Sequence, residues 1–271
     1  MHSHFNYDSW KNEYNGLLEE FIDKSIYVLY SGGKDSSLAL DLMSRASREY
    51  GFHFEAHGSP FPRHRYTDQE RQRLESYWSD RGVQITWHDP GVGDDSIQAD
   101  VNPCRSCRSV NKGLLKEVMT SAQESADGLV LVAGYSLWDI VSYSIEHILG
   151  SVYAASESDV GTQKNDRFLE TAQRFYPVLQ MVNGNTVFRP LIRYNEGEIV
   201  RLLEEREIPV LSTPCRYKSF RPKRPLMNYY QDMDLSFDYD KVFEFAKKAL
   251  DLPASSSYTD IPFGDFLVRL F

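Results

Sequence analysis

The stretch that most constrains the fold is YVLYSGGKDSSLALDLM, residues 27–43. A short β-rich apolar run is followed by a glycine turn and then by residues with amphipathic-helix spacing, so the stretch predicts a strand, a tight turn and a helix. Gly32 and Gly33 let the turn approach a ligand closely. A helix beginning directly after such a turn presents unpaired N–H groups and a positive dipole end, which bind anions. Four side chains add hydrogen-bond donors: Ser31, Lys34, Ser36 and Ser37.

Composition sets the class of protein. The chain has 271 residues, of which 41% are hydrophobic and 25% charged, as in soluble globular domains. The sequence contains no apolar run of about 18 residues, and its N-terminus lacks the features of a signal peptide, so we expect a cytoplasmic protein with no membrane partner. A net charge of −9 argues against a broadly basic surface but allows a local basic patch.

Apolar strands alternate with helical segments along the chain. This alternation predicts an α/β fold: a doubly wound parallel sheet of about five strands with helices on both faces. The strands are expected at 25–31, 52–59, 83–91, 128–136 and 186–194, and the helices at 8–24, 36–51, 67–82, 109–127, 137–150, 195–209 and 239–251. We divide the chain into a helical lead-in (1–24), a nucleotide-binding domain (25–215) and a C-terminal helical extension (216–271).

Three cysteines form the second notable pattern. Cys104 and Cys107 form a C-x-x-C between the third strand and a helix, and Cys215 follows the helix after the fifth strand. Segments beyond the carboxyl ends of strands meet at one sheet edge, so the three thiols are expected to converge. Three thiolates suit a [4Fe–4S] cluster with one open iron. A Cys104–Cys107 redox disulfide, or a Zn²⁺ site completed by His57 or His88, remains an alternative.

The glycine turn resembles the PP-loop, S-G-G-x-D-S, of the ATP pyrophosphatase superfamily. With the C-x-x-C and the lone cysteine that ends FRPLIRYNEGEIVRLLEEREIPVLSTPC, the order of motifs resembles the iron–sulfur-dependent tRNA thiolases, the tRNA 2-thiocytidine and 2-thiouridine synthetases. The resemblance covers roughly residues 20–220. It implies an adenine nucleotide α-hydrolase-like (HUP) fold and cleavage of ATP to AMP and pyrophosphate. A substrate carbonyl is adenylated in this reaction, and sulfur replaces its oxygen.

The resemblance also implies roles for individual residues. Asp35 positions Mg²⁺ and Lys34 stabilises charge on the phosphates, while Lys112 or Arg108 polarises the carbonyl or holds the α-phosphate. In VAGYSLWDI the family segment G-H-x-x-D-D is matched only in part, by Gly134 and Asp139, since a tyrosine replaces the histidine and a tryptophan the first aspartate. The stretch that begins at His57 is expected to line the adenosine pocket.

The expected partners are tRNA and a sulfur donor, either sulfide or a persulfide carrier. Basic residues interleaved with aromatic ones follow the third cysteine, a composition typical of nucleic-acid contacts; the expected substrate contacts are Lys218, Arg221 and Lys223. Alternative functions remain open: a PP-loop amidotransferase or ligase with structural zinc, thiolation or desulfuration of a small molecule, or a redox-sensing nucleotide-binding regulator. The sequence also leaves the oligomeric state open, a homodimer included.

Overall fold

A six-stranded sheet forms the centre of the computed structural model, which describes residues 5–123, 128–153, 171–220, 223–262 and 266. The strand order is β3-β2-β1-β4-β6-β5, and neighbouring strands run parallel except β5, which pairs antiparallel with β6. The predicted doubly wound α/β fold is confirmed, with β5 as an additional edge strand. The strands are β1 (Ser25–Tyr30), β2 (Glu55–Gly58), β3 (Ile85–Trp87), β4 (Leu129–Val132), β5 (Val178–Gln180) and β6 (Thr186–Phe188).

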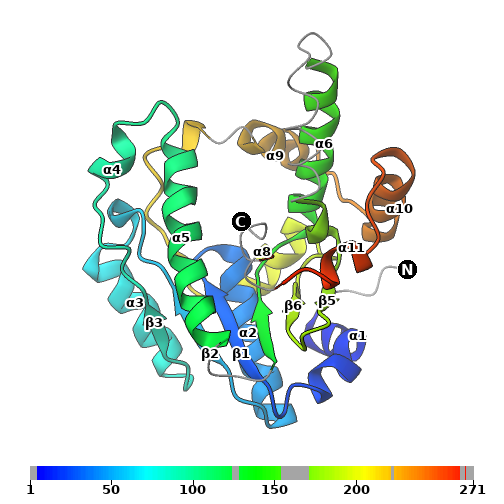
Figure 1. Ribbon diagram of the computed structural model, residues 1–271. Coiled ribbons are helices and arrows are strands. Elements are labelled where there is room, and N and C mark those ends of the chain that lie inside the picture. The colour runs from blue at the N-terminus through cyan, green and yellow to red at the C-terminus, as the bar shows by residue number, and fades with distance from the viewer. Residues whose placement is uncertain (1–4, 124–127, 154–170, 221–222, 263–265, 267–271) are drawn as a thin grey trace.

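Helices cover both faces of this sheet (Figure 1). The described helices are α1 (Tyr7–Glu19), α2 (Lys34–Tyr50), α3 (Asp68–Ser79), α4 (Asp95–Gln98), α5 (Pro103–Gln123), α6 (Leu137–Tyr153), α8 (Glu196–Glu205), α9 (Lys223–Asp232), α10 (Tyr239–Ala249) and α11 (Ser256–Thr259). Short 3₁₀ turns lie at η1 (Arg63–Arg65), η2 (Gln173–Phe175) and η3 (Lys218–Phe220). None of the described helices combines the length and apolar character that spanning a bilayer requires.

Each face of the sheet has its own hydrophobic core, because alternate side chains of a strand point to opposite faces. In β4, Val130 and Val132 join the core that α1, α2 and α8 cover. Leu129 and Leu131 join the second core, to which α6 and α10 contribute. The sheet is therefore buried on both sides, and its carboxyl edge remains the place where polar groups can gather.

The predicted strand at 186–194 is too long. The sheet pairing stops at Phe188, and a turn follows. Arg189 donates its N–H to the carbonyl of Pro177 at 2.8 Å, and Pro190 has no N–H to give to a ladder. The arginine–proline–leucine run therefore follows a strand rather than beginning one, and it turns the chain towards α8.

The C-terminal segment packs as part of the sheet's second core. Tyr239, Ala246 and Leu250 are buried in the same cluster as Leu131 of β4 and Val187 of β6. Figure 1 shows α9 and α10 beside α6, which both of them contact. The division of the chain at residue 215 stays a prediction about domains, while the packing ties this segment to the central sheet.

Candidate functional site

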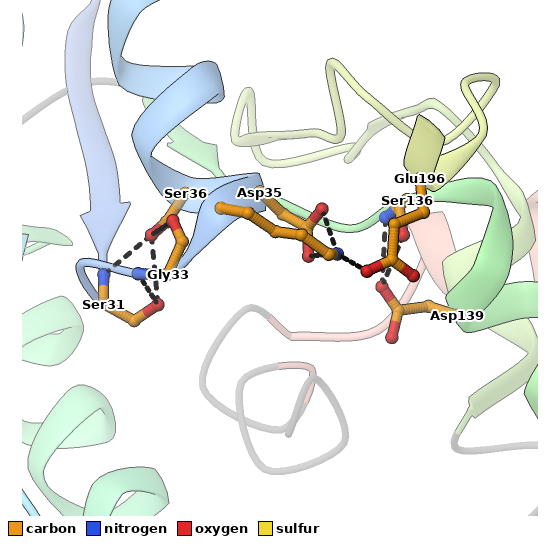
Figure 2. A network of polar contacts seen from close by, with 8 residues as sticks. Ser31, Gly33, Asp35, Ser36, Ser136, Asp139 and Glu196 are labelled. Atoms are coloured by element: carbon orange, nitrogen blue, oxygen red, sulfur yellow. Dashed lines mark hydrogen bonds and ion pairs between the residues drawn. The ribbon is translucent and has the colours of Figure 1, made fainter. Parts of the chain in front are cut away.

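The glycine turn joins the carboxyl end of β1 to the first residue of α2, and its own serines hold it in shape. Ser36 Oγ accepts the N–H of Ser31 at 3.1 Å and donates to the carbonyl of Gly33 at 3.1 Å (Figure 2). Gly32 has φ of 63°, in the region that favours glycine. Gly33, the N-cap of α2, makes no side-chain capping hydrogen bond. The first amides of α2 therefore keep the orphan donors that suit a phosphate.

The four predicted donor side chains differ in how far they are exposed. Ser31 lies at the surface and Lys34 is half-buried. Ser36 is 6% exposed and its hydroxyl holds the turn, while Ser37 is fully buried on the inner face of α2. Ser37 donates its amide to the carbonyl of Gly33 at 2.9 Å. The amide of Ser37 is therefore used within the helix and its hydroxyl is buried, and its contact with a nucleotide stays a prediction.

Lys34 contacts two carboxylates at this sheet edge, those of Asp35 and Glu196, and Figure 2 shows Asp139 close to them. Lys34 Nζ lies 2.8 Å from both carboxylate oxygens of Asp35 and 3.6 Å from Oε1 of Glu196 at the start of α8. Burial, opposed by Lys34 but reinforced by Asp139 and Glu196, raises the pKa of Asp35 to about 6. Burial would lower the pKa of Lys34, but Asp35 and Glu196 raise it overall, so the ammonium stays charged. The cluster therefore contains one cationic side chain, Lys34, and more carboxyl groups than that cation can pair with.

Asp139 and Gly134, the matches in the segment after β4, both lie near the start of α2. Asp139 Oδ2 accepts the N–H of Ser136 at 3.0 Å and thereby caps α6, so part of its role is structural. A Cβ at Gly134 would lie 2.9 Å from the backbone carbon of Asp35 and 2.9 Å from the backbone nitrogen of Ser36. The absence of a side chain at Gly134 therefore lets the segment after β4 approach the first turn of α2.

The C-x-x-C lies within α5, not in a loop before a helix, which corrects the predicted helix start at 109. Asn102 accepts the N–H of Arg105 with its side-chain oxygen at 3.2 Å and so caps the helix, and Pro103 occupies the first helical position. Cys104 and Cys107 are three residues apart in a helix and therefore share a face. Asn111, one turn further, donates to the carbonyl of Cys107 at 2.9 Å.

Cys215 lies in residues 210–217, which we name the Cys215 segment. At its beginning, Leu211 donates its N–H to the carbonyl of Gly32 in the glycine turn at 2.6 Å. At its end, the carbonyl of Tyr217 accepts a hydrogen bond from Cys104 Sγ at 3.3 Å. One short segment therefore contacts the glycine turn with one end and the start of α5 with the other, and Cys215 lies between the two contacts.

The chain between β2 and α3, together with the first turn of α3, holds the other side of the Cys215 segment. Arg65 Nε donates to the carbonyl of Thr213 at 3.2 Å, and Glu70 accepts the hydroxyl and the N–H of Ser212. Tyr66 donates its hydroxyl to the carbonyl of Ser31 at 2.9 Å. The stretch expected to line the adenosine pocket thus contacts both the glycine turn and the cysteine-bearing segment.

His57 contacts His88 and Tyr27. Its Nδ1 is 2.9 Å from Nε2 of His88 on the neighbouring strand end, and its ring stacks on Tyr27 with centroids 4.2 Å apart. Burial, reinforced by His88, lowers the pKa of His57 to about 4. His57 is therefore a neutral, largely buried ring on the sheet face, and its contact with adenosine stays a prediction.

The predicted cationic residues are only partly placed. Arg108 and Lys112 lie on α5 beyond the C-x-x-C, Arg108 exposed and Lys112 half-buried. Lys218 is exposed in η3. Arg221 lies outside the described residues, and for Lys223 the structure describes the helix but not the side chain. Their contacts with a substrate stay predictions.

A second basic stretch, PFPRHR at 60–65, also offers candidate nucleic-acid contacts, but its Arg63 is paired within the protein. Its Nη2 lies 2.8 Å from Oδ1 of Asp89, and its Nε donates to the carbonyl of Val92 at 2.9 Å. Because Asp89 offsets the charge of Arg63, this stretch has less positive charge with which to bind nucleic-acid phosphates.

The three cysteines are half-buried thiols, none of them in a disulfide. Among the described side chains, no three of the His, Cys, Asp and Glu type lie close enough together to hold one metal ion. The zinc alternative requires such a tight group of ligands around a single ion. A [4Fe–4S] cluster instead distributes its thiolates over separate irons, so three thiols on two touching segments fit it better.

Two residues at this site were not predicted from the sequence: Glu196, which lies beside Lys34, and His64, whose Nε2 accepts the N–H of Arg216 at 3.0 Å. Glu196 follows the fifth predicted strand and begins a helix. Residues in such positions lie at the carboxyl edge of the sheet, so Glu196 could have been predicted there from the sequence. The contacts of His64 join residues far apart in the chain and have no signal in a single sequence.

Comparison with known proteins supports the fold. No protein-family model and no curated sequence matches the chain. Among solved structures, it is similar to the "U34-tRNA thiolase NcsA from Methanococcus maripaludis with its [4Fe-4S] cluster", with a TM-score of 0.62 and 17% identity over 91% of this chain and 82% of that one. NMN synthetase from Francisella tularensis aligns with a TM-score of 0.34 and 13% identity, over 98% of this chain and 94% of that one. The chain therefore shares the α/β fold of this solved structure, built on a mostly parallel six-stranded sheet.

Proposed function

We propose that the chain is an ATP-dependent sulfurtransferase that adenylates a carbonyl of a tRNA base and replaces its oxygen with sulfur, forming AMP and pyrophosphate. The observation that carries this proposal is the Cys215 segment. Its N–H at Leu211 bonds to Gly32, and its carbonyl at Tyr217 accepts from Cys104. A nucleotide bound at the turn would therefore lie in the same site as the thiols. The fold shared with a tRNA thiolase supports the choice of tRNA as substrate.

The start of α2 would bind the phosphates of ATP. Its uncapped first amides supply hydrogen-bond donors, and the helix dipole favours negative charge. Lys34, charged and half-buried, would neutralise the charge that develops on the departing pyrophosphate. With its pKa near 6, Asp35 is largely ionised at neutral pH and can bind a cation. Asp35, the carboxylate nearest to the turn, would help to hold a Mg²⁺ ion, which would offset the negative charge of the phosphates.

Cys104, Cys107 and Cys215 would hold the [4Fe–4S] cluster. When bound, such a cluster supplies an iron without a protein ligand, which can carry inorganic sulfide. In the first chemical step, the base carbonyl oxygen attacks the α-phosphorus and pyrophosphate leaves. In the second, hydrosulfide attacks the carbonyl carbon of the adenylated base, the bond from that carbon to the oxygen breaks, and AMP departs with the oxygen while the sulfur loses its proton. Arg108 and Lys112 extend from the helix that bears two of the thiols, and they would hold the α-phosphate between these steps.

The substrate is tested by mass spectrometry of tRNA nucleosides from cells with and without the gene. We expect one thionucleoside to disappear and to return with the wild-type gene but not with Asp35→Asn. Asp80→Asn is the matched control, because Asp80 is exposed at the end of α3, away from the glycine turn. An unchanged set of thionucleosides contradicts tRNA thiolation.

The interaction with tRNA is tested through its salt dependence. Removing one phosphate contact should flatten the log–log slope of affinity against salt by roughly one unit. The triple variant Lys218→Ala, Arg221→Ala and Lys223→Ala should therefore show a flatter slope for bulk tRNA and unchanged ATP binding. Lys247→Ala with Lys248→Ala, on α10, controls for a general decrease in positive charge. A wild-type protein without salt-sensitive tRNA affinity contradicts this part of the proposal.

A further inference from the structure

A chain of hydrogen bonds leads from Asp94 through His64 to the residue after Cys215. Asp94 Oδ2 lies 2.6 Å from Nδ1 of His64, and the Nε2 of His64 accepts the N–H of Arg216 at 3.0 Å. The side chain of His64 is 3% exposed, and its ring packs edge-on to Tyr217 at a centroid distance of 5.5 Å. The imidazole thus connects an acidic loop to the Cys215 segment.

These contacts define the tautomer of the ring. Because Nε2 accepts a backbone N–H, it carries no proton, so Nδ1 carries the proton and donates it to Asp94. Asp94 is fixed in turn by the backbone N–H groups of Arg63 at 2.7 Å and His64 at 2.9 Å. Burial alone would raise the pKa of Asp94, but the hydrogen bonds from His64 and Arg63 lower it, so it stays a carboxylate.

Cys215 is bracketed by fixed neighbours. Two residues before it, the carbonyl of Thr213 accepts from Arg65, and Pro214 has a restricted φ. Directly after it, Arg216 is held by His64, and the carbonyl of Tyr217 then accepts from Cys104. The contact of His64 is the one adjacent to the cysteine itself, so it has the most direct control over where the thiol lies.

We propose that His64, oriented by Asp94, is a positioning residue that fixes Cys215 so that its thiol joins Cys104 and Cys107 in one metal centre. This inference rests on the proposed function and deepens it. His64 supplies no ligand to the metal; it acts through the backbone of Arg216. Groups that hydrogen-bond behind the ligands of a metal site orient those ligands, and their loss weakens metal binding.

Two variants of His64 distinguish the loss of its hydrogen-bond acceptor from the loss of its ring. His64→Leu removes the acceptor, while His64→Gln keeps an amide oxygen that can accept the N–H of Arg216. His53→Leu is the matched control, because His53 is exposed and precedes β2. After anaerobic reconstitution, the iron retained against a chelator is measured. We expect retention in His64→Leu to weaken by about ten- to a hundredfold, the usual range when such an orienting partner is removed, with His64→Gln and His53→Leu near wild type.

A second measurement needs neither iron nor turnover. In the apoprotein, amide exchange at Arg216 and alkylation of Cys215 relative to Cys104 are followed by mass spectrometry. Removal of one hydrogen bond should speed exchange at Arg216 by about fivefold in His64→Leu. His64→Leu with wild-type iron retention and wild-type exchange overturns the proposal. A wild-type chain that takes up no iron refutes the proposed function instead, and the apoprotein measurements then decide whether His64 positions Cys215.

Discussion

The close contact at Gly134 makes a quantitative prediction about the site. Replacing Gly134 with Ala places a Cβ 2.9 Å from the backbone carbon of Asp35, 2.9 Å from the backbone nitrogen of Ser36 and 3.0 Å from the backbone oxygen of Asp35. All three atoms belong to the first turn of α2, so no side-chain rotation relieves the contact. Gly134 is not among the glycines with positive φ, so alanine fits its backbone and the effect comes from packing alone.

The size of the effect follows from these distances. Ordinary van der Waals contact begins at 3.4 Å, so the start of α2 must withdraw from 2.9 Å to at least that distance. Overpacking of this kind costs about 1–3 kcal/mol of unfolding free energy. The withdrawal is comparable with the tolerance of about 0.5 Å within which catalytic groups must be held. Since a 1 Å misplacement can cost about a hundredfold in rate, we expect the catalytic efficiency with ATP to fall at least about tenfold.

Urea denaturation and pyrophosphate release test this reasoning together. Gly16→Ala is the control, because a Cβ at that position in α1 meets nothing within 4 Å. Alanine within a helix should there raise stability by about 0.5–1 kcal/mol and leave turnover unchanged. Wild-type stability and wild-type pyrophosphate release in Gly134→Ala would refute the close-approach argument.

Three further predictions concern the turn, a buried histidine and the thiols. Gly32→Ala should lower the unfolding free energy by about 1–3 kcal/mol in urea, because its φ of 63° strains a residue with a side chain; an undiminished stability contradicts this. The pKa of His57 is about 4 instead of 6.5, so the folded protein binds this proton less tightly and loses stability as pH falls from 6.5 towards 4. His57→Phe should reduce that slope of unfolding free energy against pH, and an unchanged slope excludes His57 as its source. Replacing Cys104, Cys107 or Cys215 singly with Ser should remove most of the bound iron to a similar extent, and full iron content in any one variant excludes that residue.

The sheet could be predicted from the sequence because its parallel strands are buried on both faces and are therefore continuous apolar runs. The predicted strands extend too far where the chain leaves the sheet to build the site, as at Gly134 and Pro190. The edge strand β5 was missed: it has only three residues and pairs antiparallel, so it carries neither the length nor the spacing of a recognisable strand. The start of α5 at Pro103 could also have been predicted, because an asparagine followed by a proline, here Asn102 and Pro103, often begins a helix.

The candidate site was predictable at the level of residue types but not of pairings. The glycine turn and the three cysteines are local patterns, and the topology predicts that they converge. The contact of Leu211 with Gly32, or of His64 with Arg216, depends on how loops separated by more than a hundred residues fold against each other. One sequence does not contain that information. The same holds for the carboxylate of Glu196 beside Lys34, although its position at the sheet edge was foreseeable.

The second hydrophobic core has a consequence for how the chain is made. Tyr239, Ala246, Tyr258 and Phe266 are buried together with side chains of β4 and β6. During synthesis these residues leave the ribosome after the strands that they cover, so part of one sheet face stays exposed to water and to other chains in the meantime. Exposed apolar surface of this kind makes nascent proteins prone to aggregation. We therefore expect the nascent chain to bind chaperones until this segment has emerged and packed.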